Sequence, residues 1–190
     1  PSTPIIDLWE TLAQPSDLYQ AGYQYGVSEI AGPSGCPIPP IPHDGILKFS
    51  SSGNAAPYKL SGWSGAENWG TWSEGPQAKL RLPFPTKAIA DATLDFELQL
   101  IADVFYPSPV KPQIVELVVN DVSIAHWSFA NGDSSNVRTA RVPSAVVAQK
   151  SPAIIIFKVE HPTSPASTGS STDTRQLGLG VRELRIETPK

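Results

Sequence analysis

The 190-residue sequence contains no methionine and only one cysteine, Cys36. A single cysteine excludes a disulfide within the chain, and the flanking residues Gly35 and Pro37 form no signature of a catalytic cysteine. An intact gene product would begin with methionine, whereas this chain begins with Pro1. We therefore expect a mature form or a fragment of a longer polypeptide.

Charged residues are also scarce, at 17% of the chain, and the formal net charge is -4. No run of basic residues occurs, so nucleic acids and anionic membrane surfaces are not expected as partners. No apolar stretch approaches the roughly 18 residues of a membrane span, so no direct membrane insertion is expected. The hydrophobic content of 40% is sufficient for the core of one globular domain.

Common catalytic and metal-binding motifs are missing. Three widely spaced histidines, His43, His126 and His161, form no HxH or HExxH spacing, and no G-x-S-x-G elbow is present. No cofactor is therefore expected. One metal hypothesis stays open, because loop carboxylates in β-sandwiches can hold a structural calcium. The aspartates considered for it are Asp91, Asp95, Asp121 and Asp133.

Proline, in contrast, is plentiful, with 20 residues, and it disfavours long helices. Residues 1–45 are predicted to form an N-terminal extension or connector. A short helix is expected from Ile5 to Ala13, and the proline-rich stretch AGPSGCPIPPIPHDG follows as an extended segment. Residues 46–190 are predicted to form a separate β domain.

Alternating apolar and polar residues predict short strands throughout this second region. In ATLDFELQLIADVF, Leu94, Phe96, Leu98 and Leu100 point to one face. Asn120 and Asp121 favour a tight turn in a hairpin over residues 113–129. Further strands are predicted in ILKFS, YKLSG, AKLRLPF, NVRTARVP, AIIIFKVE and QLGLGVRELRIE. Eight or nine strands without intervening helices predict an all-β antiparallel sandwich of the jelly-roll type.

The most informative segment is SGWSGAENWGTWSEG, residues 61–75, with Trp63, Trp69 and Trp72 among four glycines. An indole face can stack on the C–H groups of a sugar ring, and the neighbouring Glu67 and Glu74 could fix its hydroxyl groups. The alternative is that the rings cover the edge of the sandwich core. Both interpretations can hold for different rings. Trp127, in the predicted hairpin, is expected in the core.

A second polar pair lies at the end of a long Ser/Thr/Pro-rich loop. Asp173 and Arg175 are two residues apart, which places their side chains on one face of an extended chain. Arg175 is a candidate to contact Glu67, Glu74 or a ligand hydroxyl group. The alternative is a salt bridge between Asp173 and Arg175 that fixes the loop.

Glu67 and Glu74 also raise the question of catalysis. Glycosidases use two carboxylates about 5 Å or about 6.5–9.5 Å apart, a separation that the sequence does not give. A small glycoside hydrolase or lyase that uses this pair is therefore a lesser alternative.

The runs KLSGWSGAENWGTWSEGPQAKLRLPF, VELVVNDVSI and SPASTGSSTDTRQLGLGVRELRI together resemble a bacterial accessory β-sandwich domain. This domain occurs at the C-terminal ends of envelope glycan-handling proteins, such as membrane glycosyltransferases and phosphoglycerol-transferase-like enzymes. The resemblance covers residues 46–187. The matching positions are Gly62, Trp63, Glu67, Trp69, Gly70, Trp72, Ser73, Gly75, Asp173, Arg175, Leu177 and Gly178.

The resemblance implies a non-catalytic, carbohydrate-binding-like module outside the cytoplasm, either periplasmic or secreted. Its expected partners are a glycan or polysaccharide and a neighbouring domain of the parent chain. The expected ligand-binding residues are Trp63, Glu67, Trp69, Trp72, Glu74, Asp173 and Arg175. The main alternative is a structural or docking domain that braces a catalytic or membrane domain.

Overall fold

A computed structural model describes residues 38–84, 95–106, 108 and 111–187. The predicted N-terminal helix, Asp91 and Leu94 lie outside these residues. The chain divides into two compact units, Pro1–Pro37 and Ile38–Lys190, and all described residues belong to the second unit. The boundary expected at residue 45 stays a prediction.

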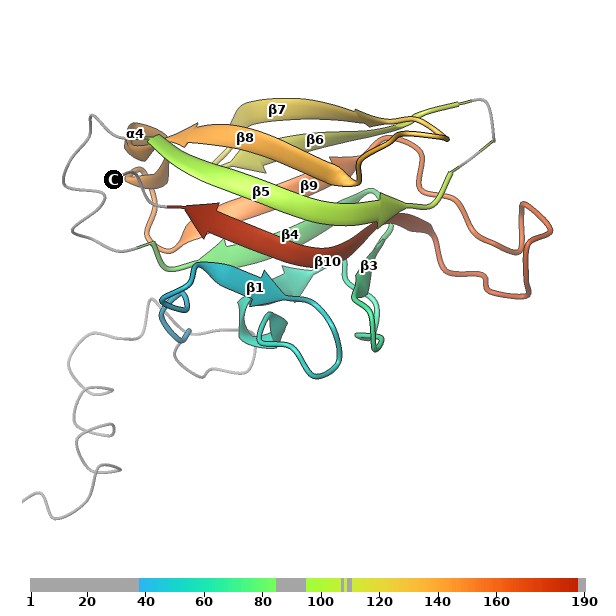
Figure 1. Cartoon of the computed structure of the whole chain (residues 1–190), viewed down its shortest axis with the longest axis horizontal. Coiled ribbons are helices and arrows are strands. Elements are labelled where there is room, and N and C mark those ends of the chain that lie inside the picture. Colours follow the sequence, from blue (N-terminus) through green and yellow to red (C-terminus); the bar gives the residue numbers. More distant parts are fainter. Residues whose placement is uncertain (1–37, 85–94, 107, 109–110, 188–190) are drawn as a thin grey trace, which may run out of the picture. The chain divides into compact units, whose positions relative to one another are not determined.

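The second unit is a sandwich of two antiparallel sheets, with ten strands among the described residues (Figure 1). The strands are β1 (Ile46–Lys48), β2 (Lys59–Ser61), β3 (Thr71–Glu74), β4 (Gln77–Leu82), β5 (Asp95–Val104), β6 (Gln113–Val119), β7 (Val122–Phe129), β8 (Val137–Pro143), β9 (Ala153–Val159) and β10 (Leu177–Glu187). A 3-10 turn, η1 (Ala56–Tyr58), and one helical turn, α4 (Ser144–Val147), interrupt them.

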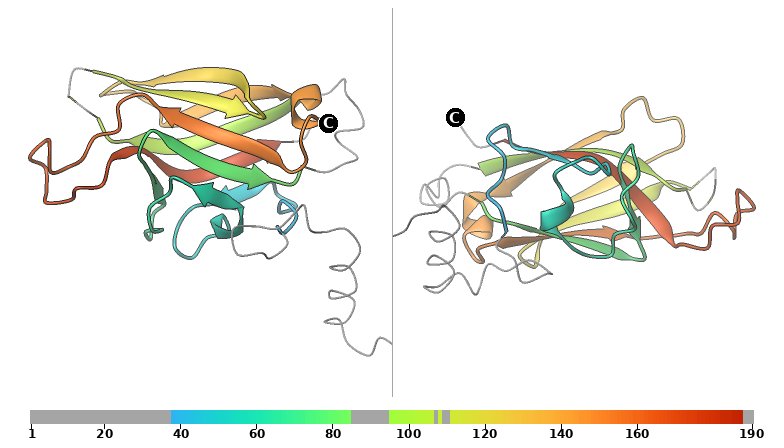
Figure 2. Two further views of the ribbon diagram at one scale, coloured as in Figure 1. Left: turned by 180° about the vertical axis from the view of Figure 1, so that it is seen from behind. Right: turned by 90° about the horizontal axis from the view of Figure 1, so that it is seen from below.

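The strand order confirms the predicted jelly roll. One sheet, here called the front sheet, has the order β1-β10-β5-β8, and β3 also pairs with β10. The other, here called the back sheet, has the order β2-β4-β9-β6-β7. Successive strands from β4 onward alternate between the sheets or form the β6–β7 hairpin, which is the double Greek key connection (Figure 2).

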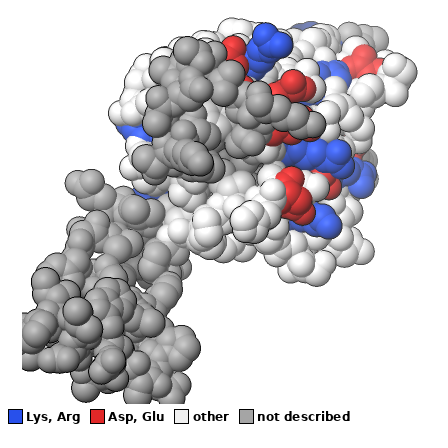
Figure 3. All heavy atoms as spheres, turned by 60° about the vertical axis from the view of Figure 1, so that its left-hand side comes forward, with Lys and Arg blue, Asp and Glu red and all other residues white. Residues whose placement is uncertain are grey.

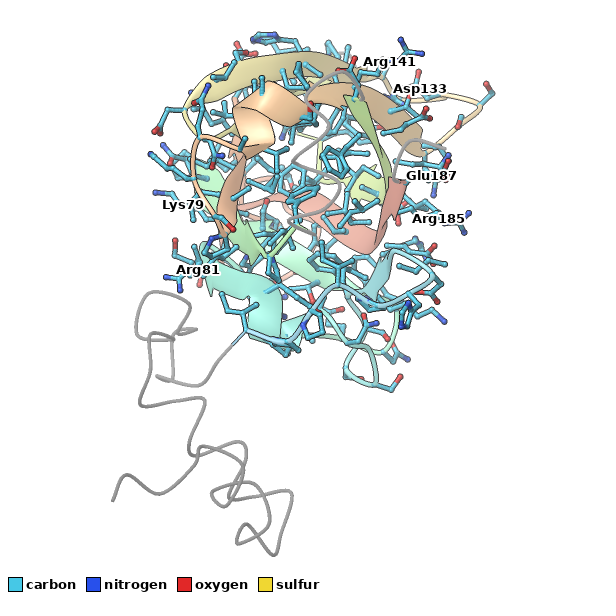
Figure 4. The ribbon with its side chains drawn as sticks, turned by 90° about the vertical axis from the view of Figure 1, so that its left-hand side faces the viewer. Lys79, Arg81, Asp133, Arg141, Arg185 and Glu187 are labelled. Carbon is cyan, nitrogen blue, oxygen red and sulfur yellow. The ribbon has the colours of Figure 1, made fainter. Side chains whose placement is uncertain are left out.

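The core lies between the sheets and follows the predicted alternation. Phe96, Leu98 and Leu100 of β5 are fully buried, and so are Leu80 and Leu82 of β4. Charged side chains point outward from both sheets. Figure 4 shows Lys79 and Arg81 on one side of the sandwich, with Arg141, Arg185 and Glu187 on the other.

Several local predictions are confirmed. Asn120 and Asp121 form the β6–β7 turn with φ values of 46° and 70°. Trp127 is 6% exposed, as expected for a core residue. The two helical turns and strand β3, of three or four residues each, were not predicted. Among the described residues, no helix has the length and apolar character needed to cross a membrane.

Candidate functional site

The tryptophan-rich segment folds as a narrow loop that leads into β3. Trp63 forms an antiparallel bridge with Ser73, and the Ser64 N–H donates to the Trp72 carbonyl at 2.9 Å. At the tip, the Glu67 N–H donates to the Gly70 carbonyl at 2.8 Å. These bonds hold Trp69 and Trp72 close to each other at the edge of the front sheet.

Two glycines permit this path. Gly62 has a φ of +76°, and a Cβ there would lie 1.8 Å from the Gln77 carbonyl oxygen. A Cβ on Gly70 would lie 2.4 Å from the carbonyl oxygen of Val181. Gly70 therefore lets the loop approach the backbone of β10.

Trp63 packs against core side chains. Its ring centroid lies 5.3 Å from that of Phe49 and 6.2 Å from that of Phe157. Its indole N–H donates to the Lys79 carbonyl at 2.8 Å, so its polar atom is satisfied within the fold. These contacts pack Trp63 against the core, but its side chain is half-buried, like those of Trp69 and Trp72. Its expected role in ligand binding stays a prediction.

Trp69 and Trp72 lie instead on the outer side of the front sheet, and both are half-buried. Their ring centroids are 5.2 Å apart and their planes meet at 73°. A Cβ on Gly180 of β10 would lie 2.8 Å from a ring atom of each indole. The two rings therefore rest on the bare backbone of Gly180, and we call this arrangement the tryptophan corner.

Polar side chains surround the tryptophan corner. The Trp69 indole N–H donates to Glu67 Oε2 at 2.7 Å, and Arg175 Nη2 lies 3.7 Å from Glu67 Oε1. The predicted contact between Arg175 and Glu67 is thus present. Arg175 also makes the alternative salt bridge, with Nη2 2.6 Å from Asp173 Oδ2. This hydrogen bond lowers the pKa of Asp173 from its usual value.

Three further residues of this site were not singled out in the sequence. The Arg182 guanidinium lies 5.2 Å from the centroid of the Trp69 ring, within range of a cation–π contact. Its Nε and Nη2 atoms both lie 2.7 Å from Asp103 Oδ2. Gly180 is the third. Asp103 and Arg182 are 79 positions apart, and only the β5–β10 pairing brings them to the corner. No local motif indicates them.

The Glu74 carboxylate is oriented by a different hydrogen bond from that of Glu67. Its Oε2 accepts a hydrogen bond from the buried Ser64 hydroxyl at 2.9 Å, whereas Glu67 is oriented by an indole and an arginine. The two carboxylates thus have different hydrogen-bond partners, although the charges of both contribute to the raised pKa of Arg175.

Among the described residues, no three His, Cys, Asp or Glu side chains lie close enough together to hold a metal ion such as calcium. Asp121 is paired with Lys150 at 2.6 Å and Asp133 with Arg138 at 2.6 Å. Their carboxylates are thus already engaged by cations, and we derive no role for calcium from them.

Comparison with solved structures finds β-sandwich neighbours of low similarity. One is the CBM36-1 domain of a multidomain xylanase from the hindgut metagenome of Trinervitermes trinervoides, with 15% identity and a TM-score of 0.42, covering 76% of this chain and 97% of that one. Another is a carbohydrate-binding module CBM36 in complex with calcium and xylotriose, with 13% identity and a TM-score of 0.35, covering 75% and 87%. At these scores the likeness does not carry over either ligand.

The search among curated proteins found no match. A family model, in contrast, matches residues 46–188, which is most of the chain and includes every strand described above. The chain therefore belongs to the family described as Domain of unknown function (DUF7024).

Proposed function

We propose that this domain is a non-catalytic carbohydrate-binding module whose ligand lies on the tryptophan corner. The observation that carries the proposal is the partial exposure of Trp69 and Trp72 on an outer sheet face, beside charged and polar groups. Partly exposed indoles support a binding module over a scaffold, in which all three rings would be fully buried.

The chemistry of the corner suits a sugar ring. The C–H groups of a pyranose face carry slight positive charge and pack on the electron-rich face of an indole. Glu67, Arg175 and Arg182 stand close to the rings and supply acceptors and donors for hydroxyl groups. A short oligosaccharide offers few contacts and is flexible, so we expect a dissociation constant of about micromolar to millimolar.

The wider setting is also a proposal. The sequence resemblance supports an accessory domain of a bacterial envelope glycan-handling protein, placed in the periplasm or secreted. Cell fractionation of the full-length protein tests this placement. A strictly cytoplasmic location would contradict it.

Calorimetric titration with envelope glucans and other bacterial glycans tests the binding function. We expect Trp69→Ala and Trp72→Ala each to weaken binding at least about fivefold, because the stacking of a flat ring on an aromatic side chain, as measured for nucleic-acid bases, contributes about 1–3 kcal/mol. The control is Trp127→Phe, a buried tryptophan whose indole N–H donates to the Thr139 carbonyl. Unchanged affinity in both corner variants would reject the proposal.

The same protein preparation tests the enzymatic alternative. If glycan hydrolysis or elimination products appear and are lost in Glu67→Gln or Glu74→Gln, the module is an enzyme and the non-catalytic assignment is wrong.

A further inference from the structure

The outer face of the front sheet continues from the tryptophan corner across two more strands. Trp72 of β3 pairs with Gly180 of β10, and Gly180 pairs with Asp103 of β5. Directly paired residues on antiparallel strands point to the same face of a sheet. Trp72 and Asp103 therefore lie in one row, with the bare backbone of Gly180 between them.

A hollow lies at the far end of this row. The Ala102 N–H donates to the Asn136 carbonyl at 3.0 Å, which places Asn136 beside β5 just before the start of β8. The hollow has a volume of about 190 Å³, and Asp103, Tyr106, Asp133 and Asn136 are among its lining residues. Figure 4 places Asp133 on the same side of the sandwich as Arg141 and Arg185.

The Arg182–Asp103 ion pair connects the two ends. Arg182 contacts Trp69 at the corner, and its partner Asp103 lines the hollow. The path crosses β3, β10, β5 and the start of β8, which are neighbours in that order. Three steps between adjacent strands, at about 4.8 Å each, give a length of about 14 Å. This length exceeds one sugar ring and suits several linked rings.

The charges along the path are balanced. Its two arginines are each paired with a carboxylate, Arg175 with Asp173 and Arg182 with Asp103. Asp133, which lines the hollow, is in turn paired with Arg138. An anionic ligand would have to compete with these carboxylates, whereas a neutral hydroxyl group can bond to the remaining donor and acceptor positions. On the face shown in Figure 3, acidic and basic side chains likewise lie next to one another.

We propose that the tryptophan corner and the hollow are the two ends of one groove, which runs across the strands and binds neutral oligosaccharides of three or more sugar units. This inference rests on the proposed function and specifies its ligand class. The corner stacks one sugar ring, the Arg182–Asp103 pair bonds the next, and the hollow with the exposed amide of Asn136 receives the far ring.

Calorimetry with neutral gluco-, xylo- and manno-oligosaccharides of one, three and six units tests the groove. The best neutral trisaccharide should bind at least about tenfold more tightly than its monosaccharide. Asn136→Ala should weaken trisaccharide binding about three- to tenfold, the effect of one lost hydrogen bond, and leave monosaccharide binding unchanged. The matched control is Gln149→Ala, an exposed amide in the turn that follows α4.

Ligand charge is tested with acidic galacturonate trisaccharides. We expect wild-type protein to bind them at least about tenfold more weakly than the best neutral trisaccharide. Asp103→Asn leaves Arg182 without this carboxylate and should reduce that difference. A wild-type preference for the acidic trisaccharide would overturn the neutral assignment.

The possible failures are distinguishable. If mono- and trisaccharides bind with equal affinity and Trp72→Ala abolishes the binding of both, the proposal of an extended groove is wrong, whereas the proposed binding function stands. If no sugar of any length binds to protein that unfolds cooperatively in urea, the proposed function fails as well.

Discussion

At the scale of single residues, the tryptophan corner depends on a side chain that is missing. Gly180 has ordinary strand geometry, so its role is to leave room, not to permit a left-handed backbone. Trp69 and Trp72 occupy the space where a Cβ would stand. The two indoles can lie against β10 only because this position has no side chain.

Gly180→Ala is therefore expected to displace both indoles. The added methyl group would lie 2.8 Å from each ring, and we expect a loss of about 1–3 kcal/mol in the free energy of unfolding, typical of overpacking. Urea denaturation measures this loss, and a changed tryptophan emission spectrum should accompany it. The control is Gly65→Ala, where nothing lies within 4 Å of the added Cβ. Equal stability in the two variants would contradict the proposed contact.

The sequence predicted the residues of the site only in part. Glu67, Trp69 and Trp72 stood out because unusual residue types gather within a few positions, and Arg175 because it follows Asp173 by two positions at the end of a long loop. Asp103 and Arg182 did not, since each is an ordinary charged residue on a strand and becomes special only through the β5–β10 register. Trp63 could not be separated from its two neighbours, because composition does not tell which ring meets Phe49 and Phe157.

At the scale of elements, buried polar side chains hold strands and connections in place. The Ser73 hydroxyl accepts from the Leu179 N–H at 2.8 Å, and the Thr71 hydroxyl donates to the Phe49 carbonyl at 2.6 Å. The first bond fixes β3 against β10, where regular pairing is interrupted by a register shift, and the second joins β3 to the segment that follows β1. The position of the tryptophan corner thus depends on two small side chains.

The β6–β7 turn contains a similar device. Asn120 is 3% exposed, its Nδ2 donates to the Val146 carbonyl at 2.8 Å, and its Oδ1 accepts from the Ile154 N–H at 2.8 Å. One side chain therefore joins the hairpin to α4 and to β9. Alternation and turn chemistry predicted the hairpin, whereas this long-range bonding was not visible in the sequence.

Replacement of Asn120 by glycine removes the side-chain hydrogen bonds and keeps the backbone turn, so it measures the two contributions to stability separately. Glycine accepts the φ of 46°, so the expected loss of about 2–4 kcal/mol in unfolding free energy comes from the lost hydrogen bonds and the unsatisfied backbone groups. Asp121→Gly is the matched control in the same turn. Asp121 is exposed and contacts Lys150 only at the surface, so its replacement should cost clearly less stability than the replacement of Asn120. Equal losses would show that the backbone conformation, not the network, determines stability.

At the scale of the whole molecule, ion pairs distributed over the sandwich predict sensitivity to acid. Hydrogen bonds from Arg175 lower the pKa of Asp173, and hydrogen bonds from the Ala130 N–H and from Arg138 lower the pKa of Asp133. A carboxyl group whose pKa is lower in the folded state binds fewer protons than in the unfolded chain. Its contribution to the stability of the fold is complete at pH values above the pKa of the unfolded state, and it is lost as the pH falls through the pKa of the folded state.

Stability should therefore decline as the pH falls below about 5, through the ordinary aspartate pKa of 3.8 and beyond it. Urea midpoints at pH 7, 5, 4 and 3 measure this decline. Asp173→Asn should reduce stability at pH 7 and show a smaller decline between pH 5 and pH 3. Asp95→Asn, at the exposed start of β5, serves as the matched aspartate control. A parallel decline in Asp173→Asn and wild type would remove Asp173 from this explanation.

The angle of 73° between Trp69 and Trp72 has a stereochemical consequence. Two coplanar rings would accept any flat molecule, in any rotation about the stacking axis. Two nearly perpendicular rings instead constrain both the thickness and the outline of a ligand, because a ligand that stacks on one indole has its edge against the other. Epimers that differ by one axial hydroxyl group would therefore contact the second indole differently, and the tryptophan corner would discriminate between sugars by their configuration.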